Sequence, residues 1–576
     1  MAARTPLASD EQYSPLYFLA ALGAGGLAAN FYVWLLFWVP HPDRPVPVFE
    51  DIIVAVTNGT TPLQSAIAVA VAGIVIFALL HLGLLGWNLV RFARYRGTDA
   101  ARLLRTGNSE TQLLALPLTV AMTINVGFVL GMVFVPGLWS VVEWLFPAAI
   151  AAFLLVGIWA LSLLGDFYGR VLTQGGFDCG RNNSFAQMLP AFALVMVGVG
   201  LSAPAAMSVT PWIAGLGYVL STFFIVAAVL LGAAKMVLGL RSMLETGANA
   251  ETAPTLWIGV PILTVLTIAL VRLGHGAEVH FGDQATAIHH FDLMLALLSA
   301  QISFLMLGWA VLRRQGYFRR YVFGREISPG SWVLICPGVA MAVMLHFFVN
   351  QGLVNVGLIG KFDLAYWTLS GLALLVQAVT ILLVLRIGFN QRRAARGDGV
   401  APVTGCAQCS DETQIILANL MPAWPEQLKT SLAWNGKRIA VANGQTLFRP
   451  GDLCRGFLLI LKGRLRVEHR ASSDQPPTPL YTIGPGESCV VTTACLVSAT
   501  RYQAQGIADG DVEVLVLPSQ VFQGLVAGSE SFRAIAFGVF ADKVNAFVDV
   551  IDELLLRQGQ RSTATASSAA LSRTEA

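Results

Sequence analysis

The sequence predicts an α-helical polytopic membrane domain of about ten spans, followed by a C-terminal β-roll (jelly-roll) domain with flanking helices. Hydrophobic residues make up 55% of the 576-residue chain and charged residues only 12%, whereas soluble domains carry roughly 25% charged residues. Apolar runs recur between residues 16 and 385, and short strands of alternating polarity occupy residues 434–530. The chain therefore combines a membrane half with a soluble domain.

Composition also excludes several classes of protein. The net charge of +3 provides no basic surface for nucleic acid, and no recognition-helix motif is present. The seven cysteines are odd in number and scattered, so they do not form a disulfide framework. No G-x-S-x-G, H-E-x-x-H, Walker A or Rossmann signature occurs, so we expect no enzyme and no catalytic residues.

Each predicted span holds about twenty apolar residues, the length that crosses roughly 30 Å of hydrocarbon. The ten runs are Leu16–Val39, Ser65–Leu89, Leu113–Val135, Leu138–Leu164, Met188–Met207, Trp212–Ala234, Thr255–Val271, Leu293–Leu312, Trp332–Val349 and Leu364–Leu385. The first run has no cleavage site and continues into further spans, so it is predicted to be an uncleaved helix.

Basic residues in the short loops predict the orientation, because Lys and Arg resist translocation. They gather after the second, fourth, sixth, eighth and tenth spans, whereas the alternate loops offer little beyond Arg44, Arg272 and Lys361. Both termini are therefore predicted to be cytoplasmic, with the chain in the inner (plasma) membrane and the lipid bilayer as its first partner.

Helix breakers recur in the odd-numbered spans, among them Gly23, Gly127, Gly198, Pro261 and Pro337. Breakers are tolerated at membrane depth where the freed backbone faces protein or a watery cavity, so these five helices are candidates to line a pore. The alternative is close helix packing through small residues.

Three segments resemble the tellurite-resistance/dicarboxylate transporter family, which includes the plant slow anion channels. They are Pro15-Leu-Tyr-Phe18 with Leu22-Gly-Ala-Gly-Gly-Leu27, Pro254-Thr-Leu-Trp-Ile258 with Pro261, and Ser331-Trp-Val-Leu-Ile-Cys-Pro337. The resemblance implies five helical hairpins around a central pore for a small anion, usually in a homotrimer.

The same resemblance implies a gate. In the family, a W-x-x-x-F-P pattern on the ninth helix supplies a phenylalanine that plugs the channel, and this chain has Cys336 at that position before Pro337. The smaller thiol predicts a less occluded pore, or one closed by Met344 or Phe347. The alternative is a buried cysteine that packs beside a proline kink.

Few polar residues lie inside the spans, the main ones being Asn125, Glu143, His346 and Gln377. Such groups are costly in lipid and mark pathways by default. None is a fixed charge well inside the bilayer, so the sequence predicts a pore that selects anions by helix dipoles, backbone groups and size.

An outer loop is predicted between the seventh and eighth spans. It holds four histidines, His275, His280, His289 and His290, among acidic residues. Imidazoles and carboxylates at such spacing can bind zinc or copper, yet the spacing matches no defined motif. Solvated loop residues are the alternative, and no metal is firmly predicted.

Four domains follow: the membrane domain at residues 1–390, a cytoplasmic linker at 391–426, the β-roll domain at 427–557 and a disordered tail at 558–576. The linker holds Cys406-Ala-Gln-Cys409, a C-x-x-C pair that can bind metal or cycle as a thiol pair when a second pair or redox fold supports it. Two unremarkable thiols are the alternative.

The β-roll is predicted from seven short strands with glycine turns. These are Lys437–Ala442, Thr446–Phe448, Phe457–Leu461, Arg464–His469, Pro479–Ile483, Tyr502–Ala508 and Val512–Leu517. The glycine spacing is similar to the cyclic-nucleotide-binding fold of cyclic-AMP-receptor/Fnr regulators, whose long dimerising helix is matched by Ser531–Leu556. No helix-turn-helix follows, so a transcription factor is excluded.

A cyclic nucleotide is the effector that this resemblance implies, and no other cofactor is firmly predicted. In the family a glycine-glutamate turn and an arginine followed by a small residue grip the cyclic phosphate. Gly486 and Glu487 fit this pattern, whereas Arg501 is followed by Tyr502 and falls about one position late. A β-roll that senses another ligand or mediates assembly is the alternative.

The sequence therefore predicts an inner-membrane anion channel or facilitative transporter, regulated by a cytoplasmic sensory domain. The alternative is a membrane receptor whose helices bind a solute and whose β-roll relays the signal to a cytoplasmic partner. A trimeric pore and a dimerising helix favour different symmetries, so the sequence predicts a homo-oligomer without fixing its order.

Overall fold

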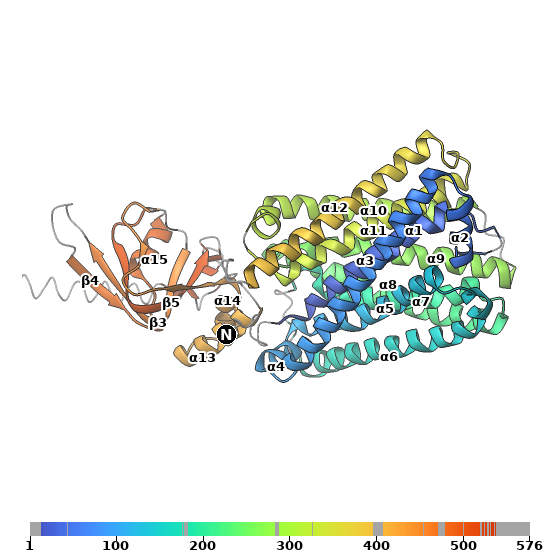
Figure 1. The fold of residues 1–576 in the computed structure, drawn as a ribbon. Helices are drawn as coiled ribbons and strands as arrows, with labels where there is room; N and C mark the ends of the chain where they lie inside the picture. The colour runs from blue at the N-terminus through green and yellow to red at the C-terminus, as the bar shows by residue number, and fades with distance from the viewer. Residues whose placement is uncertain are drawn as a thin grey trace, which may run out of the picture. The chain divides into compact units, whose positions relative to one another are not determined.

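The chain forms two compact units in a computed structural model, residues 1–402 and 403–576 (Figure 1). The structure describes residues 13–42, 44–175, 177, 182–282, 287–324, 326–395, 407–452, 454, 456–469, 478–498 and 500–518, and short pieces up to residue 536. Each unit is considered by itself.

The N-terminal unit is helical. Its α-helices are α1 (Phe18–Trp38), α2 (Phe49–Asn58), α3 (Thr61–Tyr95), α4 (Asp99–Thr106), α5 (Ala115–Phe134), α6 (Val142–Gln174), α7 (Leu189–Met207), α8 (Pro211–Thr246), α9 (Gly259–Phe281), α10 (Ala287–Arg314), α11 (Ile335–Phe347) and α12 (Leu364–Ala395). Within the described residues, ten helical segments are long and apolar enough to cross a membrane. The predicted fold class of this unit is confirmed.

The inner helices α1, α5, α7, α9 and α11 each begin with a 3₁₀ segment. These segments are Pro15–Tyr17, Asn108–Leu114, Phe185–Met188, Ala253–Trp257 and Pro329–Leu334. A proline lies at or near the start of each inner helix, where its missing N–H costs no hydrogen bond. Three of these 3₁₀ segments, those before α1, α9 and α11, overlap the segments that resemble the transporter family.

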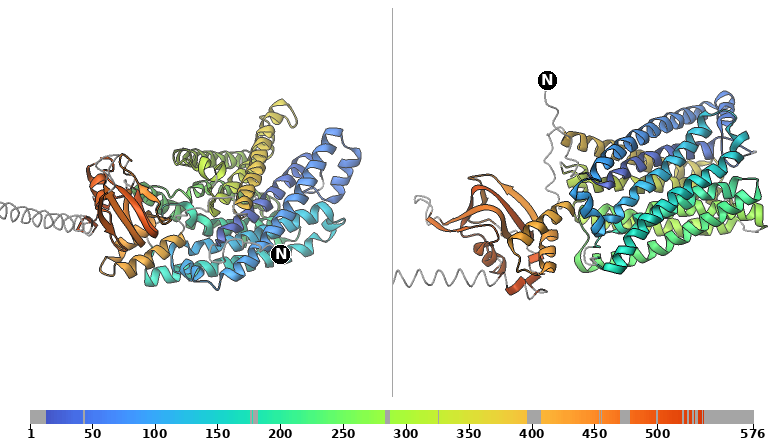
Figure 2. Two further views of the ribbon diagram at one scale, coloured as in Figure 1. Left: turned by 60° about the vertical axis from the view of Figure 1, so that its left-hand side comes forward. Right: turned by 90° about the horizontal axis from the view of Figure 1, so that it is seen from below.

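Burial separates the two sets of helices. The apolar windows of the five inner spans are 56% to 94% buried, against 22% to 39% for the five that follow them, counted over the described residues. Each inner helix packs against the outer helix after it, and α1, α5, α7, α9 and α11 also pack in sequence, with α11 returning to α1. The unit is therefore five hairpins around a closed ring of inner helices. Figure 2 shows the helices of this unit from two further sides.

The C-terminal unit contains an antiparallel sheet that, in the described residues, has five strands. They are β1 (Lys437–Val441), β2 (Thr446–Phe448), β3 (Gly456–His469), β4 (Thr478–Ile483) and β5 (Gln505–Pro518). The order is β1-β5-β3-β4, and β2 pairs with β5. The jelly-roll fold class predicted for this domain is confirmed.

Strands β3 and β5 are longer than the sequence predicts, because each of them joins two predicted strands. The predicted strands on either side of Gly463 are one strand, β3, which stays paired with β5 through a register shift at Lys462. Gly463 has φ +79°, and a Cβ there would lie 2.4 Å from the Asp511 carbonyl oxygen. The glycine therefore marks a bulge rather than a turn between strands.

Three helices accompany the sheet; flanking helices were predicted for this domain, but no bounds were predicted for these three. They are α13 (Ala407–Leu420), α14 (Glu426–Asn435) and α15 (Val490–Ser498). Helix α13 lies within the segment predicted as a linker. Most of the predicted helix Ser531–Leu556, and all of the tail at 558–576, lie outside the described residues.

Alternate side chains of β3 and β5 enter two cores. Phe457, Leu459 and Leu515 pack with Leu432 of α14, whereas Leu458 and its alternates fill the interior of the roll. The period of two in the sequence thus produces a sheet that is buried on both faces.

Candidate functional site

The ring of inner helices encloses a cavity of about 270 Å³. Nearly all of its lining residues come from α1, α5, α7, α9 and α11, with a few from α6. Most of these side chains are aliphatic, aromatic or methionine. The cavity is thus an apolar space at the centre of the helical unit, and its few polar groups decide what it can hold.

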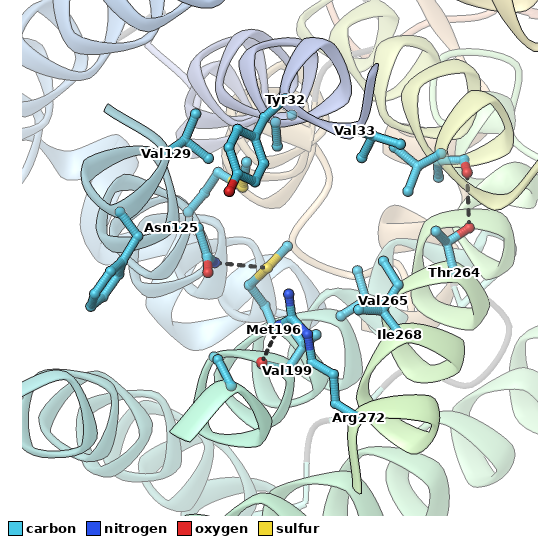
Figure 3. A pocket seen from close by; sticks show the side chains of 18 of the residues that line it. Tyr32, Val33, Asn125, Val129, Met196, Val199, Thr264, Val265, Ile268 and Arg272 are labelled. Carbon is cyan, nitrogen blue, oxygen red and sulfur yellow. Dashed lines mark hydrogen bonds between the residues drawn. The ribbon is translucent and has the colours of Figure 1, made fainter. Parts of the chain in front are cut away.

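Arg272 provides a fixed positive charge in this cavity. It follows Thr264 and Ile268 on one face of α9 at intervals of four residues, and all three line the cavity. Its Nη1 donates to the carbonyl oxygen of Val199 at 3.2 Å. Figure 3 shows the side chain extending from α9 towards the centre of the space.

Arg272 forms no ion pair with any carboxylate in the described part of the chain. The carboxylate of Asp51 binds Arg44, with Oδ1 2.7 Å from Nη1. A cation held in an apolar cavity without a protein counterion is costly, and it is stabilised when an anion enters.

Three other polar side chains lie in the same space (Figure 3). The Tyr32 hydroxyl donates to the Pro47 carbonyl oxygen at 2.9 Å, and the Thr264 hydroxyl is 3.1 Å from the carbonyl oxygens of Val260 and Ala340. The Asn125 amide nitrogen donates to the Ala121 carbonyl oxygen at 3.2 Å. These neutral side chains each donate to a backbone carbonyl oxygen. Arg272 is therefore the principal hydrogen-bond donor available to a molecule in the cavity.

Sequence reasoning missed Arg272. The prediction of a pore without fixed internal charge is wrong, because the seventh span was ended at Val271 whereas α9 continues to Phe281. Arg272, His275 and His280 lower the mean hydropathy after Val271, so a hydropathy criterion ends the span there although the helix continues. The spacing Pro261, Thr264, Ile268 and Arg272, at three and four residues, was a signal that could have extended it.

The residues predicted for the pore or gate divide into two groups. Gly23, Pro261 and Cys336 line the cavity, and so does Phe347, whereas Met344 is buried in a separate cluster. Cys336 is a free thiol with 8% of its surface exposed.

The other three predicted residues, Gly127, Gly198 and Pro337, do not line the cavity. A Cβ on Gly198 would lie 3.0 Å from Ile225 of α8, so this glycine allows helix packing. Gly127 is exposed, and a Cβ there would meet no atom within 4 Å.

The polar candidates inside the spans have separate roles. Glu143 accepts hydrogen bonds from Ser208 Oγ at 2.8 Å and Val209 N at 2.9 Å, and so fixes the turn before α8. Gln377 accepts from Trp34 Nε1 at 2.9 Å. His346 is fully buried, and neither ring nitrogen has a hydrogen-bond partner among the described residues.

The histidines predicted in an outer loop lie on helices instead. His275 and His280 belong to α9, and His289 and His290 to α10. Glu278 is 3.8 Å from the His275 ring and 3.9 Å from the His290 ring, while His280 Nε2 contacts the Ser208 carbonyl oxygen at 3.0 Å. The described residues contain no group of three or more ligands placed to hold a metal ion.

In the β-roll, Gly486 and Glu487 form the turn before α15. Gly486 has φ +86°, and the Glu487 carboxylate accepts from Gly484 N at 2.9 Å. The exposed Arg501 donates to the Gly451 carbonyl oxygen at 2.7 Å. The predicted glycine-glutamate turn is therefore present, while the arginine is bound to a different loop.

Tyr502 fills part of the roll. It is 6% exposed and stacks on Phe448 with ring centroids 4.3 Å apart, and its hydroxyl lies 3.4 Å from Thr492 Oγ1. Burial raises the pKa of the Tyr502 hydroxyl and of the Cys489 thiol, so both stay protonated at neutral pH. Cys406 and the side chain of Cys409 lie outside the described residues.

Residues 438–529 match the family model described as "Cyclic nucleotide-binding domain". The match lies wholly within the C-terminal unit and does not extend to the helical unit. No curated protein matches the chain.

Among solved structures, the Thermus thermophilus Catabolite Activator Protein is 21% identical, with 24% of this chain and 62% of that chain covered and a TM-score of 0.21. The regulatory domain of Toxoplasma gondii PKA with cAMP is 16% identical, with 25% and 54% covered and a TM-score of 0.21. The cAMP-binding acyltransferase from Mycobacterium smegmatis is 26% identical, with 22% and 39% covered and a TM-score of 0.20. This chain thus spans less than two thirds of each.

Proposed function

We propose that the helical unit conducts small anions across a membrane, as a channel or facilitative transporter, and that the cyclic-nucleotide-binding-family domain regulates it. The observation that carries the proposal is Arg272, a cation that lines a central apolar cavity and has no counterion among the described residues. An anion supplies the missing charge at a site that water and lipid solvate poorly.

The arrangement of the helices supports passage through the centre. The five inner helices form a closed ring, and the outer helices present large apolar side chains such as Trp144, Leu230 and Leu382 on their exposed faces. An apolar exterior suits lipid, whereas a polar group inside a bundle marks a solute pathway. The motifs that resemble the tellurite-resistance/dicarboxylate transporter family point to the same function.

Regulation follows from the family of the C-terminal domain. An effector that binds this domain more tightly in one state of the pore shifts the equilibrium towards that state, and only such a difference in affinity can do so. A cyclic nucleotide is the proposed effector, and Glu487 at the turn before α15 is the residue proposed to bind it.

Anion flux in vesicles tests the proposal. Full-length protein should release entrapped nitrate faster than protein-free vesicles do. Arg272→Gln should slow this release by about tenfold or more, the loss expected for one hydrogen bond to a charged group. Lys361→Gln, which removes an exposed cation outside the cavity, should leave the rate unchanged.

If the wild-type protein releases no anion with or without cyclic AMP, the conduction proposal is wrong. Solute binding without flux would then favour the receptor, in which the helices bind a solute and the β-roll relays the signal.

A further inference from the structure

We propose that the Arg272 cavity selects monovalent anions that carry a planar oxygen group, such as nitrate or a small carboxylate. The inference rests on the proposed function and adds the class of substrate. Two properties of the cavity carry it, namely the number of fixed charges and the shape of the guanidinium group.

The number of charges sets the valence. Among the described residues that line the cavity, Arg272 is the only charged side chain. One bound monovalent anion brings the net charge of the cavity to zero. A divalent anion would leave one negative charge uncompensated among apolar walls, where charge is poorly stabilised. The cavity therefore disfavours sulfate and dicarboxylates.

The guanidinium group sets the shape. Arginine presents N–H donors in a rigid planar fork that matches two oxygens of one carboxylate or nitrate, whereas a halide offers no matching pair of acceptors. The Val199 carbonyl oxygen accepts from Nη1, so it holds the group in place and leaves donors free. A lysine at this position would keep the charge and lose the fork.

The walls around Arg272 disfavour strongly hydrated divalent anions such as sulfate. Met196, Val265 and Ile268 surround the guanidinium group, and they offer no hydrogen bonds to replace a strong hydration shell (Figure 3). A cavity of about 270 Å³ has room for the short apolar tail of a monocarboxylate. The size of the cavity therefore does not restrict it to monatomic anions such as chloride.

Asn125 allows a test by gain of function. Its side chain comes from α5 and points into the same space as the Arg272 side chain, with Met196 near both (Figure 3). A lysine at position 125 would place a second positive charge in the cavity. Two charges can balance a divalent anion, so Asn125→Lys should admit sulfate.

The experiment compares nitrate, formate, chloride and sulfate fluxes in vesicles that contain full-length protein. In the wild type, nitrate and formate should pass faster than chloride, and sulfate at least about tenfold more slowly than nitrate. Arg272→Lys should lose the preference over chloride and retain the exclusion of sulfate. Asn125→Lys should raise the sulfate rate relative to nitrate, whereas Asn125→Leu should not.

The outcomes separate this inference from the proposed function. If no anion passes through the wild-type protein, the proposed function itself fails. If sulfate passes as fast as nitrate, or if Arg272→Lys keeps the wild-type preference for formate, conduction stands and the selectivity inference is overturned. For variants that do not fold, judged by gel filtration in detergent, thermal unfolding of the wild-type protein decides, measured at low millimolar salt where sulfate has little non-specific stabilising effect. Formate should protect more than sulfate, and equal protection at these concentrations would overturn the inference.

Discussion

Arg272 is the one charged side chain among the described residues that line the cavity, and the proposed function depends on it. Arg272 lies on the same face of α9 as Thr264 and Ile268, and it has one backbone acceptor in Val199. A cation that lines an apolar cavity is rarely retained without a counterion. The sequence shows an arginine at position 272, but hydropathy placed it outside the predicted span. Its position inside the bundle is clear only once α9 is seen to continue from Val271 to Phe281.

Cys336 is predicted to lie beside the anion path. Replacing it with phenylalanine would place a ring in the cavity that the thiol now lines, so Cys336→Phe should lower nitrate flux by about tenfold or more through occlusion. A thiol reagent should block the wild type and have no effect on Cys336→Ala. Unchanged flux in Cys336→Phe, together with no reagent effect, would remove Cys336 from the path.

Tyr502 is predicted to restrict the interior of the β-roll. Its ring stacks on Phe448 and is almost fully buried, so Tyr502→Ala should open space and tighten cyclic AMP binding to the full-length protein, measured by calorimetry. The same change should lower the stability of the domain by about 3–5 kcal/mol. Glu487→Gln should abolish binding, and the exposed Thr482→Ala is the control.

No tightening in Tyr502→Ala, combined with no effect of Glu487→Gln, would mean that the domain senses a different ligand.

At the scale of elements, the predicted spans agree with the helices mainly in their apolar centres. Outer helices extend further than predicted because their polar ends, such as Arg91 on α3 and Arg241 on α8, continue the backbone hydrogen bonds beyond the hydrocarbon length. For the same reason the predicted seventh span omitted the end of α9, which includes His275 and His280. Hydropathy measures the part in lipid, whereas helix length also depends on contacts at the interface.

The β-roll elements show a different limit. Alternating polarity located β1, β2 and β4 closely, but the glycine at position 463 was interpreted as a turn, and helix α15 was not predicted. Strand β3 stays continuous through the bulge because it pairs with β5 both before and after it. Such long-range pairing has no local signature, so single-sequence patterns divide the strand.

Close packing between helices makes Gly200 a sensitive position. A Cβ there would lie 2.3 Å from the Phe153 ring of α6, so Gly200→Ala should lower the melting temperature in detergent, at a cost of about 1–3 kcal/mol for overpacking. Gly127→Ala is the matched control, since a Cβ at Gly127 meets no atom within 4 Å.

Adding Phe153→Leu to Gly200→Ala should recover part of the lost stability. Equal melting temperatures for Gly200→Ala and the wild type would contradict the packing argument.

For the whole molecule, the helix breakers of the odd-numbered spans and the resemblance both indicated these spans as the inner helices. Composition and strand patterning indicated ten spans and a β-roll, and the described residues contain ten helices long and apolar enough to cross a membrane and a jelly-roll sheet. The closed ring of α1, α5, α7, α9 and α11 depends on which faces meet, and the spacing of apolar residues is silent on this because every face of a membrane helix is apolar.

Regulation belongs to the same scale. A protein that ends after Arg396 should keep nitrate flux, because the cavity and its five inner helices lie within the N-terminal unit. It should lose any response to cyclic AMP, since the family domain at residues 438–529 is removed. If the truncated and full-length proteins respond identically to cyclic AMP, the regulatory role of the domain is wrong.

The central claim is that a cation in the cavity makes the helical unit selective for anions. The reversal potential of the full-length protein in a planar bilayer, under a potassium nitrate gradient, tests this most directly. The account predicts a reversal potential near the nitrate equilibrium value in the wild type, shifted towards zero in Arg272→Gln. A reversal potential near the potassium value, or the same anion selectivity in Arg272→Gln, would contradict it.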